Sequence, residues 1–332
     1  MKRLLLIFFI APLLAEEPIT RVAAGSCYNP KRDTLGVWKA LAKEKPQLFL
    51  FMGDNIYGDT KDMEVLKAKW NVLTSRPDYI AFNKNTPILA TWDDHDYGLN
   101  DAGKEYSKRK ESQAIFRDVF GLPHTDVEGV YHSKITGPEG KRLQVILLDT
   151  RYHRTTPKRG LVGGRNGYVP QTDPKATILG EKQWRWFAAE LKKPAELRLI
   201  VSSIQVISNE HRFEKWENFP NERKRFLNLL NETSPGPTIL LSGDRHLAEI
   251  CKIPKAETGL PFDLYDFTTS GMSHAGSNDS GCNYRVDGSY SKKENFGLLD
   301  IDWSGKKPAV SMHVKSVKNG ETTHTTKVDF SK

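Results

Sequence analysis

The chain reads Leu48-Phe49-Leu50-Phe51-Met52-Gly53-Asp54-Asn55-Ile56-Tyr57 near its start, where five apolar residues pass directly into a glycine, a carboxylate and a phenol. A short apolar run that ends at a turn signal is typical of a buried strand. Gly53 lets the backbone turn sharply, so that Asp54 and Tyr57 follow the end of that strand. In open α/β sheets, such strand ends carry the chemistry.

Three further segments repeat this pattern after short apolar runs: Gly25-Ser26-Cys27, Trp92-Asp93-Asp94-His95-Asp96 and Gly243-Asp244-Arg245-His246. Together the four segments bring a thiol, a phenol, carboxylates and imidazoles to predicted strand ends. This combination of side chains indicates a metal-dependent hydrolase.

The remaining apolar runs predict an α/β fold. Strands are expected at 21–24, 48–52, 88–91, 143–148, 197–204, 238–241, 264–269, 298–303 and 310–314, and helices at 35–43, 63–73, 104–119, 180–191 and 221–230. Early strands alternate with helices, which implies βαβ units, whereas the strands after 264 follow one another and suit antiparallel pairing. We therefore predict a four-layer α/β/β/α sandwich with two mixed sheets, formed by a single domain over 16–332.

The first 15 residues form a basic start and an apolar stretch ending at Ala15, followed by two acidic residues. This pattern predicts a secretory signal peptide over 1–15 and a secreted or periplasmic protein. An uncleaved anchor is the alternative. No other segment is long and apolar enough to predict a membrane span.

The formal net charge of +8 is spread along the chain and suits anionic substrates. We expect no specific nucleic-acid partner, because no basic stripe is interleaved with aromatic residues, although nucleic acid or phospholipid remains possible as a substrate. The chain has no Walker loop, no dinucleotide fingerprint and no serine-hydrolase elbow, which disfavours nucleotide-driven and serine-acyl chemistry.

The three cysteines form an odd set for an exported protein. Cys251 and Cys282 are candidates for a disulfide in an oxidising compartment, which would leave Cys27 for another task. The alternative is that all three are small buried hydrophobic residues.

Two of the strand-end segments favour a transition metal. The carboxylate of Asp54 can bridge two cations, and Tyr57 lies three residues further on. Phenolate and thiolate ligands suit a transition metal better than a hard cation, so Tyr57 points to ferric iron and Cys27 agrees with it. A packed tyrosine in a turn and a structural cysteine remain the alternatives.

The other two segments supply carboxylates and histidines. Buried carboxylates are costly without compensating cations, so Asp94 is a candidate metal ligand, and Asp93 is placed with the substrate-binding residues. His95 is suited to contact the phosphate and protonate the leaving group. Asp244 and His246 point the same way if strand geometry continues, so each is expected to bind one of two neighbouring ions.

Two further residues are candidates for substrate contacts. Arg151 follows the predicted strand 143–148 and is suited to bind a phosphate through two parallel hydrogen bonds. An ion pair with Asp149 that only braces the loop is the alternative. His274 follows the strand 264–269 and is expected to add a contact to the substrate.

The four segments, in this order, resemble those of the PhoD-like alkaline phosphatases, a branch of the calcineurin-like metallophosphoesterases. Supporting matches are Leu148-Asp149-Thr150-Arg151, Leu179-Gly180-Glu181-Lys182-Gln183-Trp184 and Thr268-Thr269-Ser270-Gly271. The likeness covers 21–303 and implies a short form without the N-terminal β-sandwich domain of larger members.

The resemblance implies two unlike ions that share Asp54. Cys27, Asp54, Tyr57 and His246 would hold Fe(III), and Asp54, Asp94 and Asp244 would hold a second ion. Ca(II) is expected at this second site, with Zn, Mn or Mg as other possibilities. The mainly oxygen-based second set suits calcium.

The sequence and the resemblance together predict an alkaline phosphatase that acts on small phosphoesters. A hydroxide on the metals would attack phosphorus in line near Asp54, Arg151 would hold the oxyanions, and His95 would protonate the leaving alkoxide. Phosphodiesterase or phospholipase D-type activity is the first alternative. The second is a non-catalytic protein that binds phosphate or polyanions in a metal-dependent way.

Overall fold

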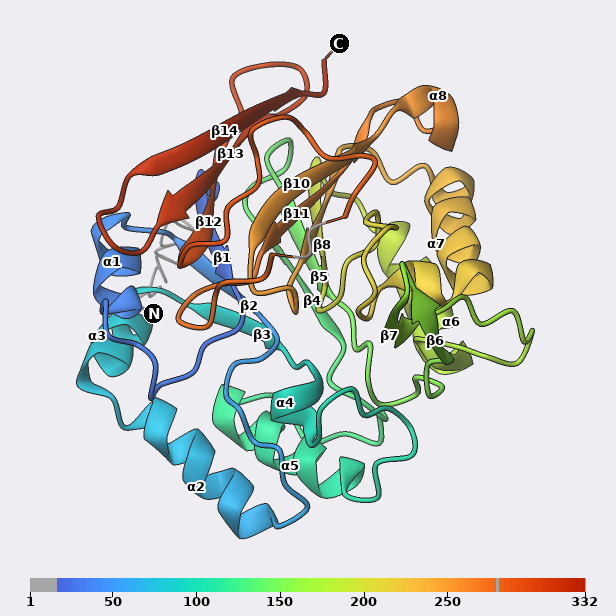
Figure 1. Ribbon diagram of the computed structural model, residues 1–332. Helices are drawn as coiled ribbons and strands as arrows, with labels where there is room; N and C mark the ends of the chain where they lie inside the picture. Colours follow the sequence, from blue (N-terminus) through green and yellow to red (C-terminus); the bar gives the residue numbers. More distant parts are fainter. Residues whose placement is uncertain (1–16, 279–280, 332) are drawn as a thin grey trace, which may run out of the picture.

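The computed structural model describes residues 17–278 and 281–331, so the predicted signal peptide at 1–15 lies outside them. Two six-stranded mixed sheets form the centre of the molecule (Figure 1). Helices cover the outer face of each sheet, which gives the predicted α/β/β/α order. The prediction of fold class is confirmed.

The first sheet has the strand order β14-β13-β12-β1-β2-β3. Strands β1, β2 and β3 run parallel, and the three C-terminal strands are antiparallel. Its strands are β1 (Arg21–Gly25), β2 (Leu48–Met52), β3 (Ile88–Thr91), β12 (Asn295–Asp302), β13 (Ala309–Ser316) and β14 (Thr322–Asp329).

The second sheet has the strand order β10-β11-β9-β8-β5-β4. Its four central strands are parallel, and an antiparallel strand lies at each edge. Its strands are β4 (His132–Thr136), β5 (Leu143–Leu147), β8 (Leu197–Ser202), β9 (Thr238–Ser242), β10 (Ala248–Ile253) and β11 (Leu264–Thr269).

A separate hairpin joins β6 (Arg159–Val162) to β7 (Arg165–Tyr168). The helices are α1 (Val37–Lys43), α2 (Met63–Thr74), α3 (Pro77–Asn85), α4 (Asp94–Tyr97), α5 (Arg109–Phe120), α6 (Gly180–Leu191), α7 (Pro220–Thr233) and α8 (Lys255–Thr258), with the 3₁₀ turn η1 (Trp216–Asn218). None of the helices described in 17–278 and 281–331 has the length and apolar character needed to cross a bilayer.

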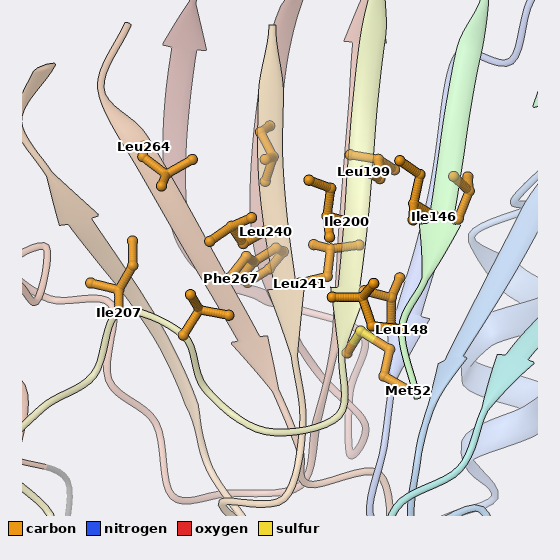
Figure 2. Packing of buried hydrophobic residues seen from close by; sticks show 14 of the residues in the cluster. Met52, Ile146, Leu148, Leu199, Ile200, Ile207, Leu240, Leu241, Leu264 and Phe267 are labelled. Atoms are coloured by element: carbon orange, nitrogen blue, oxygen red, sulfur yellow. The ribbon is translucent and has the colours of Figure 1, made fainter. Parts of the chain in front are cut away.

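Strand β2 shows why its apolar run forms a central strand. Successive side chains of a strand face opposite sides of the sheet. Leu50 and Met52 join the core between the two sheets, whereas Phe49 and Phe51 pack beneath the helices on the outer face. Figure 2 shows part of the inner core, where Met52 lies near Leu148, the residue that follows β5 of the second sheet.

Several predicted boundaries and elements differ from the structure. The predicted helix 104–119 begins only at Arg109, and the predicted strand 197–204 ends at Ser202. Strands β4, β6, β7, β10 and β14 and helices α3, α4 and α8 were not expected. Most of these elements lie at sheet edges or on the surface, where few apolar residues mark them.

Cys251 on β10 forms a disulfide with Cys282, and Cys27 is a buried free thiol. The disulfide joins β10 to the segment after residue 280. Backbone hydrogen bonds also link the two, because the Lys252 N–H donates to the Tyr284 carbonyl and the Val286 N–H donates to the Ile250 carbonyl. The cysteine that differs from the other two is therefore the one at the end of β1.

Candidate active site

The site lies where the carboxyl ends of the parallel strands of both sheets meet. The segments after β1, β2, β3 and β9 all reach this edge. Four of their residues have left-handed backbone conformations that are uncommon for residues other than glycine. These are Cys27 (φ 57°), Asp54 (φ 52°), Asp244 (φ 68°) and His246 (φ 55°).

These left-handed turns correct one step of the sequence argument. Asp244 and His246 were expected to point the same way because strand geometry continues, but β9 ends at Ser242 and both residues lie in left-handed turns. They reach the same centre through a tight turn. Gly53 is also required, since it has φ 97° and a Cβ atom there would lie 2.6 Å from the Cβ of Asp93.

The structure brings the six predicted metal ligands together. Ligand atoms of Cys27, Asp54 and His246 lie within 4.8 Å of one another, as do those of Asp54, Asp93, Asp94 and Asp244. The Tyr57 hydroxyl lies 3.1 Å from His246 Nε2 and 3.4 Å from Asp54 Oδ2. Asp54 therefore belongs to both groups, as the sequence predicted for a shared ligand.

The buried oxygen atoms of this cluster indicate that it is built for cations. Asp54 Oδ1, Asp93 Oδ2 and Asp94 Oδ1 are buried and have no hydrogen-bond partner in the described parts of the chain. Burial, together with Asp94, raises the pKa of Asp54 well above its usual value, and burial with Asp93 does the same for Asp244. Buried carboxylates without partners are costly, and bound cations would remove that cost.

The donor atoms suit two different cations. Burial first, then nearby histidines and Arg245, lower the pKa of His246 to about 3, so its imidazole is neutral, as metal binding requires. Thiol, phenol and imidazole donors around one oxygen of Asp54 suit a transition metal, whereas the carboxylates on the other side suit a hard cation. The residues therefore fit the two ions expected from the sequence.

His95 lies on helix α4 and faces the same centre. Its Nδ1 atom is 2.7 Å from Asp59 Oδ1, and its ring lies 4.4 Å from that of Tyr57, centroid to centroid. Burial opposes protonation of His95, but Asp94, Asp54 and Asp59 outweigh it and raise the pKa of the imidazole to about 11. Asp59 therefore orients the side chain, and the negative charges of Asp94 and Asp54 favour its protonated form.

Arg151 does not reach the cleft, contrary to the sequence prediction. Its guanidinium is fully buried and donates to Asp93 Oδ1 and to Glu214 Oε2, each at 2.5 Å. The alternative ion pair with Asp149 is also wrong, because the Asp149 carboxylate accepts backbone N–H groups of Arg151 and Tyr152 instead. Arg151 supports, from behind, the six candidate metal ligands, which we call the metal-ligand cluster: Cys27, Asp54, Tyr57, Asp94, Asp244 and His246.

Asp93 likewise lies where no substrate reaches it. It is fully buried, and its Oδ1 accepts hydrogen bonds from Arg151 and, at 2.7 Å, from the Ser203 hydroxyl. One of its carboxylate oxygens lies within 4.8 Å of ligand atoms of Asp54, Asp94 and Asp244. Asp93 therefore lies behind the metal-ligand cluster and is not placed for the predicted contact with the substrate.

An open cleft of about 610 Å³ gives access to the cluster. His274 lines it as predicted, with its ring centroid 3.9 Å from that of His246 and 5.0 Å from that of Tyr57. Burial lowers the pKa of His274 to about 4, with smaller effects from Arg32 and His95. A neutral imidazole can donate or accept a hydrogen bond in the cleft.

Other site residues were missed by the sequence analysis. Asp59 orients His95, and Asp96 accepts the backbone N–H groups of Asp93 and Asn55, which ties two strand-end segments together. Glu214 receives Arg151 and also pairs with Arg154. Asp96 belongs to the segment Trp92–Asp96 but was given no role, and Asp59 follows the segment that ends at Tyr57. Glu214 lies in a loop without a pattern.

Comparisons with known proteins show which family and fold this chain resembles. The sequence model of a family described as PhoD-like phosphatase matches residues 125–305. Alkaline phosphatase D of Bacillus subtilis (strain 168) is 23% identical over an alignment 282 residues long, and the match covers 70% of this chain and 46% of that protein. The chain thus spans about half the length of this curated relative.

Solved structures share the fold over 95% of this chain. A structure of PhoD aligns with a TM-score of 0.67 at 16% identity, and the alignment covers 72% of the PhoD chain. A purple acid phosphatase from yellow lupin (Lupinus luteus) seeds aligns with a TM-score of 0.63 at 11% identity, and the alignment covers 54% of its chain. GAP50, described as the anchor in the inner membrane complex of Plasmodium, gives 0.62 at 15% identity, with 90% covered.

Proposed function

This chain belongs to the PhoD-like phosphatase family, and we propose that it is a metal-dependent phosphoester hydrolase that acts first on phosphomonoesters. The observation that carries the proposal is the meeting of a thiol, a phenol, two imidazoles and four carboxylates around one buried centre, with three buried carboxylate oxygens lacking partners in the described chain. Fold alone would not support catalysis, because one fold can serve unrelated functions.

In this proposal, Cys27, Tyr57, Asp54 and His246 hold Fe(III). Asp54, Asp94 and Asp244 hold the second cation, for which Ca(II) fits the carboxylate oxygens best. Two bound cations would offset the charge of the phosphate and activate water as the nucleophile. The catalytic role of Asp54 is to keep both ions at one phosphate.

His95 is proposed to protonate the leaving alkoxide. The carboxylate of Asp59 holds Nδ1, which leaves Nε2 of the imidazole for the substrate. Cations on Asp54 and Asp94 would counter part of the charge that raises the pKa of His95, and so move it toward the range in which it gives up a proton.

Arg151 is proposed as a positioning residue. It joins Asp93 to Glu214, so the carboxylate beside Asp94 and the loop that carries Glu214 are fixed to one buried group. Because Arg151 neutralises Asp93, the negative charge of the ligand set comes from the remaining donors. These are Cys27, Tyr57, Asp54, Asp94 and Asp244. This set of about five negative charges matches one trivalent and one divalent ion.

Phosphodiester hydrolysis is the second candidate, because the cleft of about 610 Å³ exceeds the needs of a simple monoester. The test compares p-nitrophenyl phosphate with bis-p-nitrophenyl phosphate, using purified metal-loaded protein and reporting kcat/KM for each. A preference for the monoester supports our ranking, and a strong preference for the diester reverses it. If the protein binds phosphate but releases none from any ester, the proposed catalytic activity is wrong.

Export is proposed as well. It is supported by the disulfide between Cys251 and Cys282, because stable disulfides are rare in the reducing cytosol. Fractionation of cells that express the full chain tests it: the protein is expected outside the cytoplasmic fraction and without free thiols at Cys251 and Cys282.

A further inference from the structure

The cleft carries three arginines beyond the metal-ligand residues. They come from three separate parts of the chain: Arg159 on β6, Arg212 in the loop after β8, and Arg245 in the turn after β9. We call these three residues the arginine wall. The mechanism described above uses none of them.

Each guanidinium of the arginine wall is stacked on an aromatic ring of the cleft. Arg212 and Arg245 lie 4.4 Å and 4.1 Å from the centroid of Phe213, and Arg159 lies 5.1 Å from that of Tyr168. Stacking fixes the plane of a guanidinium while its N–H edge stays suited to planar or tetrahedral anions. The wall is therefore ordered before a ligand arrives.

Backbone contacts make the wall one unit. The Tyr168 N–H donates to the carbonyl oxygen of Arg212 at 2.8 Å, and Arg212 Nη1 donates to that of Asn166 at 2.9 Å. These bonds tie the hairpin of β6 and β7 (Figure 1) to the loop that leads to α7. Side chains from distant segments thus face the same space.

The four acids that line the cleft in the described part of the chain already have partners. Asp94 and Asp244 belong to the metal-ligand cluster, and Glu214 lies between the buried Arg151 and Arg154. Asp101 accepts the Tyr168 hydroxyl at 2.5 Å. Cations bound at the ligand set would offset the negative charge of Asp94 and Asp244 beside the arginine wall.

The cleft also has room beyond a single phosphate. A second cavity of about 250 Å³ shares Asn100, Asp101, Arg159 and Tyr168 with the cleft and is lined by Lys61 as well. Arg159 stands at the junction of the two cavities. A small ester of one phosphate would leave this space and its positive charge without use.

We propose that the arginine wall binds a second anionic group of the substrate while the reacting phosphate lies at the metal-ligand cluster. The preferred substrates are then phosphoesters that carry a further phosphate or carboxylate. This inference rests on the proposed function, because it concerns selection among phosphoesters at the same site.

Matched substrate pairs test the inference on the metal-loaded wild-type protein. Fructose 1,6-bisphosphate is compared with fructose 6-phosphate for a second phosphate, and 3-phosphoglycerate with glycerol 3-phosphate for a carboxylate. We expect kcat/KM to be roughly tenfold higher for the doubly anionic member of at least one pair, mainly through a lower KM, and the advantage to shrink as salt is added. The pair that shows it identifies the second group.

Substitutions then locate the effect. Arg159→Gln, which changes an exposed side chain, and Arg212→Gln are each expected to lower the ratio of kcat/KM within that pair severalfold. Arg225→Gln is the matched control, because Arg225 is also stacked on an aromatic ring, 4.6 Å from Trp184, but lies outside the cleft. The control is expected to leave the ratio unchanged.

The possible failures are distinguishable. Hydrolysis of all four esters with ratios near one in the wild type overturns the inference and leaves the proposed function intact. A high ratio that neither arginine substitution lowers also overturns it, since the selectivity then arises elsewhere. If no ester of any kind is hydrolysed, the proposed function fails and the inference fails with it.

Discussion

The Nδ1 atom of His95 lies 2.7 Å from Oδ1 of Asp59. This contact joins the segment after β2 to the helix after β3, and the backbone strengthens the junction because the His95 carbonyl accepts the Gly58 N–H at 2.9 Å. The imidazole is therefore held from both its ring and its main chain. Its orientation is set before any substrate binds, which is what a proton donor requires.

Asp59→Asn is expected to slow the hydrolysis of alkyl phosphates far more than that of aryl phosphates. Without the carboxylate, His95 loses orientation and basicity, and we expect kcat to fall about 100-fold for an alkyl phosphate but less than about tenfold for p-nitrophenyl phosphate, whose leaving group needs little protonation. Asp62→Asn in the same segment is the control, because Asp62 only caps α2. Equal losses on both substrates would contradict the role given to His95.

Arg151→Met is expected to destabilise the fold by about 3 to 5 kcal/mol, because it leaves the buried Asp93 and Glu214 without their shared partner. Urea denaturation of the metal-loaded protein measures the change. Arg225→Gln breaks an exposed pair with Glu181 and is expected to stay within about 1 kcal/mol of the wild type. A similar small change in Arg151→Met would mean that the buried pairs are not formed.

The buried His211 is expected to make stability depend on pH. Burial, with Arg245 and Lys215 nearby, lowers its pKa well below the ordinary 6.5, so the folded protein keeps it neutral. The unfolded chain binds that proton below pH 6.5, so stability falls as the pH drops through this value, by up to about 1.4 kcal/mol per pH unit for one proton.

His211→Asn tests this pH dependence. The variant retains an acceptor for the Phe213 N–H, which donates to His211 Nδ1 at 3.2 Å in the wild type. Its free energy of unfolding is expected to fall less between pH 7 and pH 5 than that of the wild type, measured by urea titration at both values. Parallel losses in the two proteins would assign the pH dependence to other groups.

Reduction of the disulfide is expected to lower stability by about 4 kcal/mol, because the bond closes a loop with a sequence separation of 31 residues. Thermal unfolding with and without dithiothreitol measures the effect. The variant Cys251→Ser/Cys282→Ser is expected to match the reduced wild type and to show no response to the reductant. A response in this variant would point to a different target, such as the bound metal.

The sequence predicted the fold best where strands are buried on both faces. The run in β2 is apolar at every position because each side of the sheet is covered. Strand β14 was missed because its exposed edge position tolerates the polar series that begins Thr322-Thr323-His324. The hairpin of β6 and β7 carried a usable signal, since Gly163-Gly164 between two short runs is a typical two-residue turn.

The sequence also located the metal-ligand cluster, because the carboxyl ends of parallel strands necessarily meet at one edge of a sheet. It failed for Arg151, whose partner is decided by Glu214 in a loop 63 positions further on. No periodicity or local motif reports such a pairing between distant loops. The arginine wall was missed for the same reason, because its members come together only in the folded chain.

The most direct test of the central claim, two unlike ions that share Asp54, is the metal content of the purified protein and of three variants, measured by mass spectrometry with a visible spectrum. We predict two ions per wild-type chain, one of them iron, with a charge-transfer band that Tyr57→Phe abolishes. Cys27→Ser is expected to lose iron selectively, whereas Asp54→Asn loses both ions. A single colourless ion, or two ions that survive Asp54→Asn, would contradict the account.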